Sequence, residues 1–269
     1  MEYHSVVSLG YRCSSAGILK SLGLKNASYP FDWLVSRLPI IDHCTKTEFA
    51  EFLNPLNYKK KKSATHYYPN MKPNSRQWIC DETILFNEFY EENQADVYIP
   101  EPLHIDNDAY AHKLMMNHHD ITKVEDRSYY ERCIERWNDL WRSNKRVLSL
   151  YIHPALNLDF YKSNRISVMR DIREFHKSMS AFYEREYDGI YVIPVITPYD
   201  SPTDHCSKYI FEEQEDDKSI QTCRICVLWA NQRYIDAGEI FMGKCFVEEY
   251  VVKEYVQTTL KLGHLPVIS

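Results

Sequence analysis

The 269-residue sequence predicts an α/β fold, with a largely parallel, doubly wound sheet that carries helices on both faces. The alternation of strands and helices favours this class, and the lack of a linker favours a single domain. Short apolar runs typical of buried strands alternate with long segments in which apolar residues recur at helical spacing. The chain also contains no Gly/Ser-rich linker and no low-complexity tract. We therefore expect a single domain over residues 1–269, with a long loop at about 54–74.

The first predicted unit is a short strand followed by a helix. An apolar run at residues 5–9 predicts the strand. Ser14 or Ser15 can cap the helix that follows, and Gly23 suits the left-handed position that ends it. Two further helical candidates lie at residues 32–38 and 42–53.

Residues 54–74 combine Pro55, Pro69 and Pro73 with the lysine run at 59–62, and this composition predicts a long surface loop. The lysine run has two interpretations. It is either a solvated face or a contact for a phosphate or an anionic glycan. Weak strand signals follow at residues 84–86 and 97–99.

The second half of the chain shows the clearest alternation of helix and strand. A capping box over residues 128–131 opens a helix that ends near 143–144. Strands are predicted at 147–152, 190–196 and 223–229, and helices at about 165–186 and 248–262. The helix at 165–186 is expected to turn six side chains inward: Ile166, Met169, Ile172, Phe175, Met179 and Phe182.

The predicted sheet also indicates where a ligand would bind. In doubly wound sheets, ligands lie beyond the carboxyl ends of the strands. Four such ends carry candidate residues: Gly10 to Cys13, His153, Thr197 with Asp200, and Asn231 with Arg233. Because loops are polar in most proteins, this grouping predicts a place for a site rather than a particular chemistry.

Cys13 is the candidate nucleophile. It stands at the start of the first predicted helix, where the positive end of the helix macrodipole and the neighbouring Arg12 both favour the thiolate. The alternative is that Cys13 is a small, buried thiol without a chemical role. The sequence leaves both interpretations open.

Histidines and carboxylates supply candidates for proton transfer. The cluster His118-His119-Asp120 contains a possible base for a thiol, but consecutive side chains rarely face one another, so Asp120 need not orient His119. The cluster can equally be a helix start in which Asp120 accepts backbone N–H groups. His153, at a strand exit, is a rival base. Asp32 lies among apolar residues and either orients a histidine or anchors its own loop.

The sequence predicts no metal site and no dinucleotide cofactor. Cys223 and Cys226 have CxxC spacing, but they lie in a predicted strand that points them to opposite faces, and no second pair completes a zinc site. The chain contains neither GxGxxG nor GxxxxGK[ST], the loops that cradle phosphates.

Composition narrows the function classes further. A net charge of -6 argues against a general nucleic-acid binder, since phosphate contacts need clustered positive charge. No window is apolar enough to span a membrane, and the N-terminus does not look like a signal peptide. We therefore expect a cytoplasmic protein whose 8 cysteines are reduced.

The first 150 residues resemble a family described as papain-like cysteine peptidases, which occurs in bacteria and large DNA viruses. Three segments carry the resemblance: residues 8–16 (SLGYRCSSA), 22–24 (LGL) with 28–33 (SYPFDW), and His119-Asp120 ahead of residues 132–141. The resemblance implies Cys13 as nucleophile, His119 as base, and Asp120 or Asp32 as orienting acid. It also implies a papain-like α+β arrangement as the alternative fold.

Three functions are compatible with these features. The first is a cysteine-dependent hydrolase or acyl-transfer enzyme that acts on a peptide or glycan without a cofactor. The second is a glycosyltransferase that uses a nucleotide-sugar donor, with or without a divalent metal, and the third is a non-catalytic glycan- or protein-binding module. The residues expected to bind a substrate are Arg12, Trp33, His153, Asp200, Asn231 and Arg233.

Overall fold

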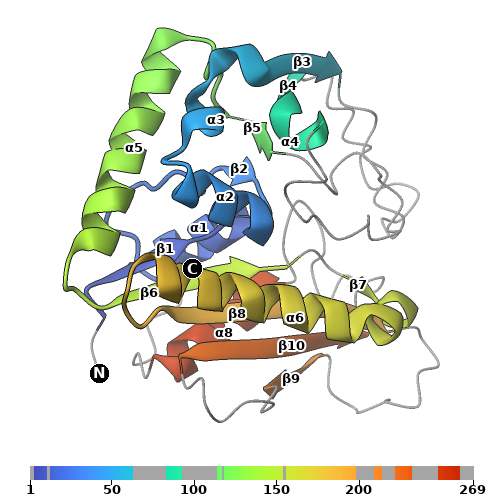
Figure 1. Ribbon diagram of the computed structural model, residues 1–269. Helices are drawn as coiled ribbons and strands as arrows, with labels where there is room; N and C mark the ends of the chain where they lie inside the picture. Colours follow the sequence, from blue (N-terminus) through green and yellow to red (C-terminus); the bar gives the residue numbers. More distant parts are fainter. Residues whose placement is uncertain are drawn as a thin grey trace.

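The computed structural model describes two β-sheets and the helices that cover them (Figure 1). The larger sheet is mostly parallel and the smaller one is antiparallel. All structural statements below concern the residues that the structure describes, which are 3–10, 13–62, 83–92, 114–116, 118–153, 156–197, 209–213, 222–231 and 248–260.

The larger sheet has the strand order β1-β6-β8-β10-β9, with β7 also paired to β8. The strands β1, β6, β8 and β10 run parallel to one another, and β9 is an antiparallel strand beside β10. The predicted α/β class, with a largely parallel sheet and helices on both faces, is confirmed. The strand bounds are β1 Ser5–Ser8, β6 Val147–Ile152, β7 Leu156–Asn157, β8 Asp188–Thr197, β9 Tyr209–Glu213 and β10 Cys223–Asn231.

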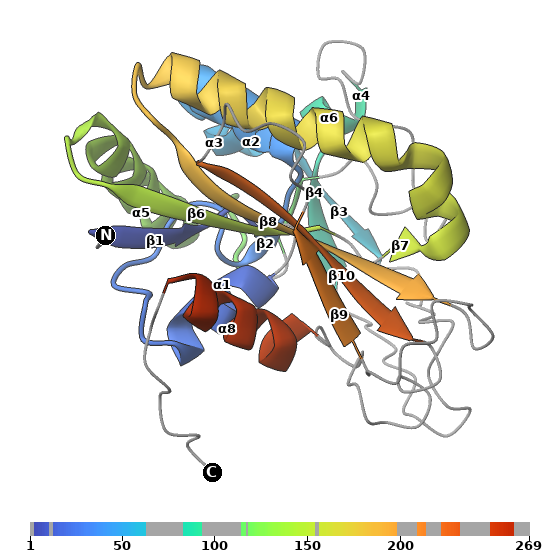
Figure 2. The same cartoon turned by 90° about the horizontal axis from the view of Figure 1, so that it is seen from below.

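Two apolar layers hold helices against opposite faces of this sheet (Figure 2). On one face, α1 (Cys13–Ser21) and α8 (Glu248–Thr259) pack against alternate strand residues such as Leu150 and Val192. On the other face lie α5 (Val124–Arg142), α6 (Leu158–Phe182) and α2 (Leu38–Lys46), over the remaining alternate residues such as Tyr151. Because strand side chains alternate between faces, a run of continuous apolar residues serves both layers.

The predicted first unit is present as β1 and α1. Gly23 has a φ of 66° and donates its N–H to Lys20, while Leu24 donates to Leu19, so the helix ends in the left-handed motif expected of Gly23. The predicted serine cap is wrong. The helix already begins at Cys13, and the Ser15 hydroxyl instead lies 2.6 Å from the Ser8 hydroxyl.

The helix expected at residues 42–53 is two helices, α2 and α3 (Ala50–Leu53). Glu48 and Phe49 separate them with φ values of 50° and 62°, a left-handed conformation that no regular helix can include. Residues 32–38, expected to be a short helix, instead contain a turn, the strand β2 (Leu34–Val35) and the first residue of α2.

A smaller sheet, which the sequence did not predict, has the order β2-β5-β4-β3. Part of the segment expected to be a loop at 54–74 has regular structure instead. Residues 55–57 form the 3-10 helix η1 (Pro55–Asn57), and residues 58–62 form β3 (Tyr58–Lys62), which belongs to this sheet. The pairing of the lysine run with β4 (Thr83–Asn87) makes it a strand. The rest of the sheet region comprises α4 (Glu88–Glu92) and β5 (Leu114–Met116), whereas residues 63–74 and 97–99 lie outside the described residues.

The two long helices α5 and α6 begin earlier than predicted. Ser128 therefore lies inside α5 instead of capping it. On α6, Ile166 was expected to face inward but is 84% exposed, because at 100° per residue it points away from Phe175. Phe182 has the phase of the buried residues, yet as the last residue of α6 it is 43% exposed. Within the described ranges, no helix has both the length and the apolar character needed to cross a membrane.

Candidate functional site

The carboxyl ends of β1 and β6 lie side by side in the larger sheet. Ser8 pairs with Leu150, and the N–H of Leu9 continues the ladder by donating to the carbonyl of Leu150 at 3.0 Å. His153 directly follows β6, and its N–H donates to Val192 at 2.7 Å. The exit of β1 toward Cys13 and the exit of β6 at His153 are thus neighbours at one edge of the sheet, as expected for parallel strands.

His153 interrupts a strand that resumes as β7. Ile152 pairs with Val192 and Leu156 pairs with Val195, so the chain between the two pairs contains one more residue than the partner strand β8 does. The ring of His153 packs edge-on against Tyr151 at 6.2 Å.

The other two predicted strand ends are farther away. From Val192, which pairs with Ile152 at the end of β6, the strand β8 continues to Thr197. At about 3.3 Å per residue, this continuation places Thr197 about 17 Å beyond the end of β6. Asn231 pairs with Thr197 and ends β10 at the same distance. The four predicted exits therefore do not form one cluster, and Asp200 and Arg233 lie outside the described residues.

Cys13 is the first residue of α1, so its backbone stands at the helix N-terminus, as predicted. The chain reaches this position from Gly10, whose φ of 77° turns it out of the sheet. A Cβ at Gly10 would lie 2.5 Å from the Ser36 hydroxyl and 2.9 Å from the carbonyl of Phe31, so only glycine fits this approach. Arg12 and the side chain of Cys13 lie outside the described part of the structure.

The segment at residues 31–36 connects this turn to the histidine cluster. The residues at its two ends, Phe31 and Ser36, pack against Gly10. In the middle, the half-buried Trp33 contacts the ring of His118 edge-on at 6.3 Å. Gly10, which precedes Cys13 by three residues, and His118, which precedes His119, therefore both contact this short stretch of chain.

His119 has a carboxylate partner, but it is not the predicted one. Its Nδ1 lies 3.0 Å from a carboxylate oxygen of Asp126, whose second oxygen accepts the backbone N–H of Asp120 at 2.7 Å. Burial raises the pKa of Asp126, but these hydrogen bonds outweigh burial and hold the pKa below its usual value. The ring of His119 also stacks on Tyr129 at 4.5 Å. Asp126 escaped the sequence analysis because only its place in the first turn of α5 distinguishes it.

Asp120 is engaged elsewhere, because consecutive side chains diverge. Its carboxylate accepts hydrogen bonds from Thr122 and lies 2.9 Å from the ammonium group of Lys60 on β3. Burial raises the pKa of Asp120, but the hydrogen bonds from Thr122 and Lys60 outweigh burial and lower it. Asp120 therefore ties the lysine strand to the His119 segment and does not orient the imidazole.

Asp32 likewise contacts no histidine among the described residues. It forms an ion pair with Lys25 and accepts the backbone N–H of Tyr29 at 2.7 Å. Burial raises the pKa of this carboxyl, and the Lys25 charge opposes that shift. Asp32 thus anchors its own turn, which is the second of the two roles considered for it.

The thiols whose side chains the structure describes are poor nucleophiles. Burial raises the pKa of Cys44 and of Cys223 to about 12, and it also raises the pKa of Cys133. Cys226 is fully buried in β10. A thiol whose pKa is raised carries little thiolate near neutral pH.

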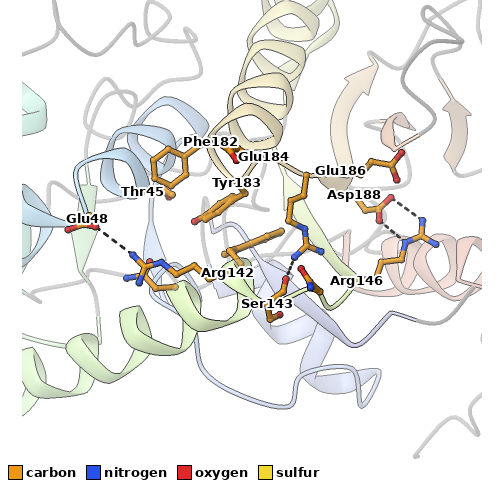
Figure 3. Close-up of a pocket in the computed structure, with 14 residues that line it drawn as sticks. Thr45, Glu48, Arg142, Ser143, Arg146, Phe182, Tyr183, Glu184, Glu186 and Asp188 are labelled. Carbon is orange, nitrogen blue, oxygen red and sulfur yellow. Dashed lines mark hydrogen bonds and ion pairs between the residues drawn. The ribbon is translucent and has the colours of Figure 1, made fainter.

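A cavity of about 680 Å³ lies at the opposite edge of the sheet, where β6 and β8 begin (Figure 3). Its three arginines all have partners. Arg146 donates two hydrogen bonds to the carboxylate of Asp188, at 2.8 and 3.2 Å, and Arg185 donates to the carbonyl of Ser143. Arg142 reaches Glu48 at 3.6 Å. This lining joins the turns after α5 and α6 and offers no surplus of cations for a nucleotide-sugar donor.

Residues 4–181 match the model of a protein family described as "Putative papain-like cysteine peptidase". The matched range covers about two thirds of the chain and includes the β1 exit, the 31–36 segment and the His119 pair. No curated protein and no solved structure matches the chain.

Proposed function

We propose that this chain, which belongs to the family of papain-like cysteine peptidases, is a cysteine-dependent hydrolase or acyl-transfer enzyme with Cys13 as its nucleophile. One observation carries the proposal: Cys13 is the first residue of α1, three residues after Gly10, whose φ is 77°. A thiol at a helix N-terminus meets the positive end of the macrodipole, which favours the thiolate. The family supports a peptide as the substrate.

In the proposed reaction, the Cys13 thiolate attacks a carbonyl carbon, a C–S bond forms and the carbonyl electrons move onto oxygen. The first N–H groups of α1 have no partner within the helix and can donate to this oxyanion. As the oxyanion collapses, the bond to the leaving group breaks and a histidine gives that group a proton. Water, or another nucleophile in acyl transfer, then cleaves the thioester and restores the thiol.

We assign the proton transfer to His119 with Asp126 as its orienting acid. The hydrogen bond at Nδ1 fixes the ring and directs the other nitrogen, Nε2, away from Asp126. The 31–36 segment, which contacts both Gly10 and His118, supports a common site for the two motifs. His153 is the competing base because it follows the strand beside β1.

Alkylation with iodoacetamide, followed by peptide mass spectrometry, tests the nucleophile. At pH 7 we expect Cys13 to react about tenfold faster than Cys133, since a lowered pKa exposes more thiolate. The variant Cys133→Ser is the matched control and should leave the Cys13 rate unchanged. Equal rates at Cys13 and at the buried thiols would remove the basis for the proposed activity.

The pH profile of the same alkylation tests the base. His119→Ala and Asp126→Asn should shift the midpoint of the Cys13 rate to higher pH, because the imidazolium no longer stabilises the thiolate. His153→Ala should leave that midpoint in place. The reverse pattern, with His153→Ala alone shifting the profile, would transfer the role of the base to His153.

A further inference from the structure

The start of α5 carries three side chains that all contact His119. Asp126, Tyr129 and Tyr130 have the spacing i, i+3 and i+4, so they lie on one face of the helix. Besides the pairing of Asp126 with Nδ1, the ring of Tyr129 stacks on the imidazole, with 4.5 Å between the ring centroids and 22° between the ring planes. Tyr130 packs edge-on against the same imidazole at 5.5 Å. The proposed reaction uses Asp126 and gives the two tyrosines no role.

Contacts other than the one with His119 also hold the ring of Tyr129. It packs edge-on against the buried Tyr130 at 5.4 Å, and Tyr130 in turn packs against Phe52 in the core at 5.2 Å. Burial raises the pKa of Tyr129 to about 12, and a hydrogen bond with Ser28 opposes that shift. The phenol is therefore uncharged near neutral pH, and Tyr129 presents a neutral aromatic face to the imidazole.

This face favours the protonated form of His119. The quadrupole of a tyrosine ring attracts a cation that lies over its face within about 6 Å of the centroid, and the imidazole is a cation only when it is protonated. The Asp126 carboxylate acts in the same direction. Lys123, whose charge acts on Asp126, and the positive end of α5 oppose it. The charge of Asp120 is paired with Lys60.

We propose that Tyr129 is a positioning residue for His119, whose ring fixes the plane of the imidazole and stabilises the imidazolium formed when the Cys13 thiol gives up its proton. This inference rests on the proposed function, because it takes His119 as the base. The side chain of His119 keeps 26% of its surface exposed, so these contacts leave the ring open to solvent. An aliphatic side chain of similar size at position 129 could pack there but could not stabilise the cation.

Proton NMR of the His119 ring tests the contact without any reaction at Cys13. The His119 signals are assigned by their loss in His119→Ala. Tyr129→Phe keeps the aromatic face and removes only the hydroxyl, whereas Tyr129→Leu removes the ring. In Tyr129→Leu we expect the ring-current shift of the His119 C–H signals to disappear and the midpoint of their pH titration to fall by about 0.5 pH unit. Tyr129→Phe should keep both the shift and the midpoint of the wild type.

Alkylation of Cys13 with iodoacetamide at pH 7 tests the effect on the nucleophile. Tyr129→Leu should react about two- to fivefold more slowly than the wild type, and Tyr129→Phe should react at the wild-type rate. Because Tyr129 acts only through the imidazole, the slowing by Tyr129→Leu should vanish when His119→Ala is already present. Tyr129→Met serves as the second ring-removing variant if the Leu variant does not fold.

The outcomes separate the two proposals. If Cys13 reacts fast but the His119 midpoint is the same with and without the ring, the role of Tyr129 is refuted and the cysteine enzyme stands. If Cys13 is unreactive but the midpoint falls only when the ring is removed, Tyr129 stabilises the imidazolium and the hydrolase is refuted. Equal slowing of Cys13 by Tyr129→Phe and Tyr129→Leu, or slowing that persists in the His119→Ala background, would make Tyr129 a structural residue.

Discussion

The turn at Gly10 gives the sharpest stability prediction, because two separate costs act at one position. Alanine there must adopt a φ of 77°, which costs about 1–2 kcal/mol for a residue with a Cβ. The new Cβ would also lie 2.9 Å from the carbonyl oxygen of Phe31, a backbone atom that cannot rotate away. Overpacking of this kind adds about 1–3 kcal/mol. We therefore expect Gly10→Ala to lower the free energy of unfolding by about 2–5 kcal/mol.

Two other glycines separate these costs. Gly23 has a φ of 66° but open space around it, so Gly23→Ala should pay only for the left-handed backbone, about 1 kcal/mol. Gly17 lies inside α1, also with open space around it, and Gly17→Ala should stabilise the protein by about 0.5–1 kcal/mol. The difference between Gly10→Ala and Gly23→Ala therefore measures the steric contact alone.

Urea unfolding followed by circular dichroism is the assay. Adding Ser36→Ala removes the hydroxyl that would lie 2.5 Å from the new Cβ, so the double variant should recover part of the loss, but the contact with Phe31 remains. We also expect slower alkylation of Cys13 in Gly10→Ala, since the displaced turn leads to α1. If Gly10→Ala costs no more than Gly23→Ala, the close approach of the 31–36 segment is wrong.

The remaining predictions concern pH and ion pairs. Burial lowers the pKa of His176 to about 4, below its unfolded value of about 6.5. The neutral, buried His176 therefore contributes about 3 kcal/mol to the free energy of unfolding above pH 6.5, and this contribution is lost as the pH falls toward 4. The variant His176→Asn, unfolded at pH 7.5 and at pH 4.5, should lose less stability between the two pH values than the wild type, and an unchanged pH dependence would contradict this. Arg146→Met leaves the carboxylate of Asp188 buried without its two hydrogen bonds from the guanidinium. This variant should lower the free energy of unfolding by about 2–3 kcal/mol, after allowance for the partly exposed arginine. Arg142→Met breaks only an exposed pair and should cost less than about 0.5 kcal/mol in the same urea titration; equal losses would refute the distinction. Ile166→Glu should be nearly neutral in thermal unfolding, because this side chain is 84% exposed.

Local patterns in the chain were sufficient for the units whose signals lie close together. The apolar run of β1, the left-handed Gly23 and the periodicity of α5 and α6 depend on neighbouring residues, and the structure contains each of them. Where a helix begins earlier than its first clear sequence pattern, the prediction placed the cap, or the side of the helix that faces the core, incorrectly. Ile166 shows this, because its place on α6 depends on how the helix is rotated against the sheet.

The smaller sheet could not be predicted in the same way. Its strands β2 and β5 are too short to show a period, and β3 is a run of lysines that becomes a strand through pairing with β4. Strand pairing is set by contacts between distant segments, which no local window contains.

What the sequence alone determined is the α/β class and the position of Cys13 at the start of a helix, because hydrophobic period and turn chemistry are local properties of the chain. Only the tertiary structure decided the partners of the charged groups. His119 lies beside Asp126 instead of Asp120, and Asp32 pairs with Lys25. The physical reason is that charge pairing and burial depend on which distant surfaces pack together, and this packing exists only once the chain has folded.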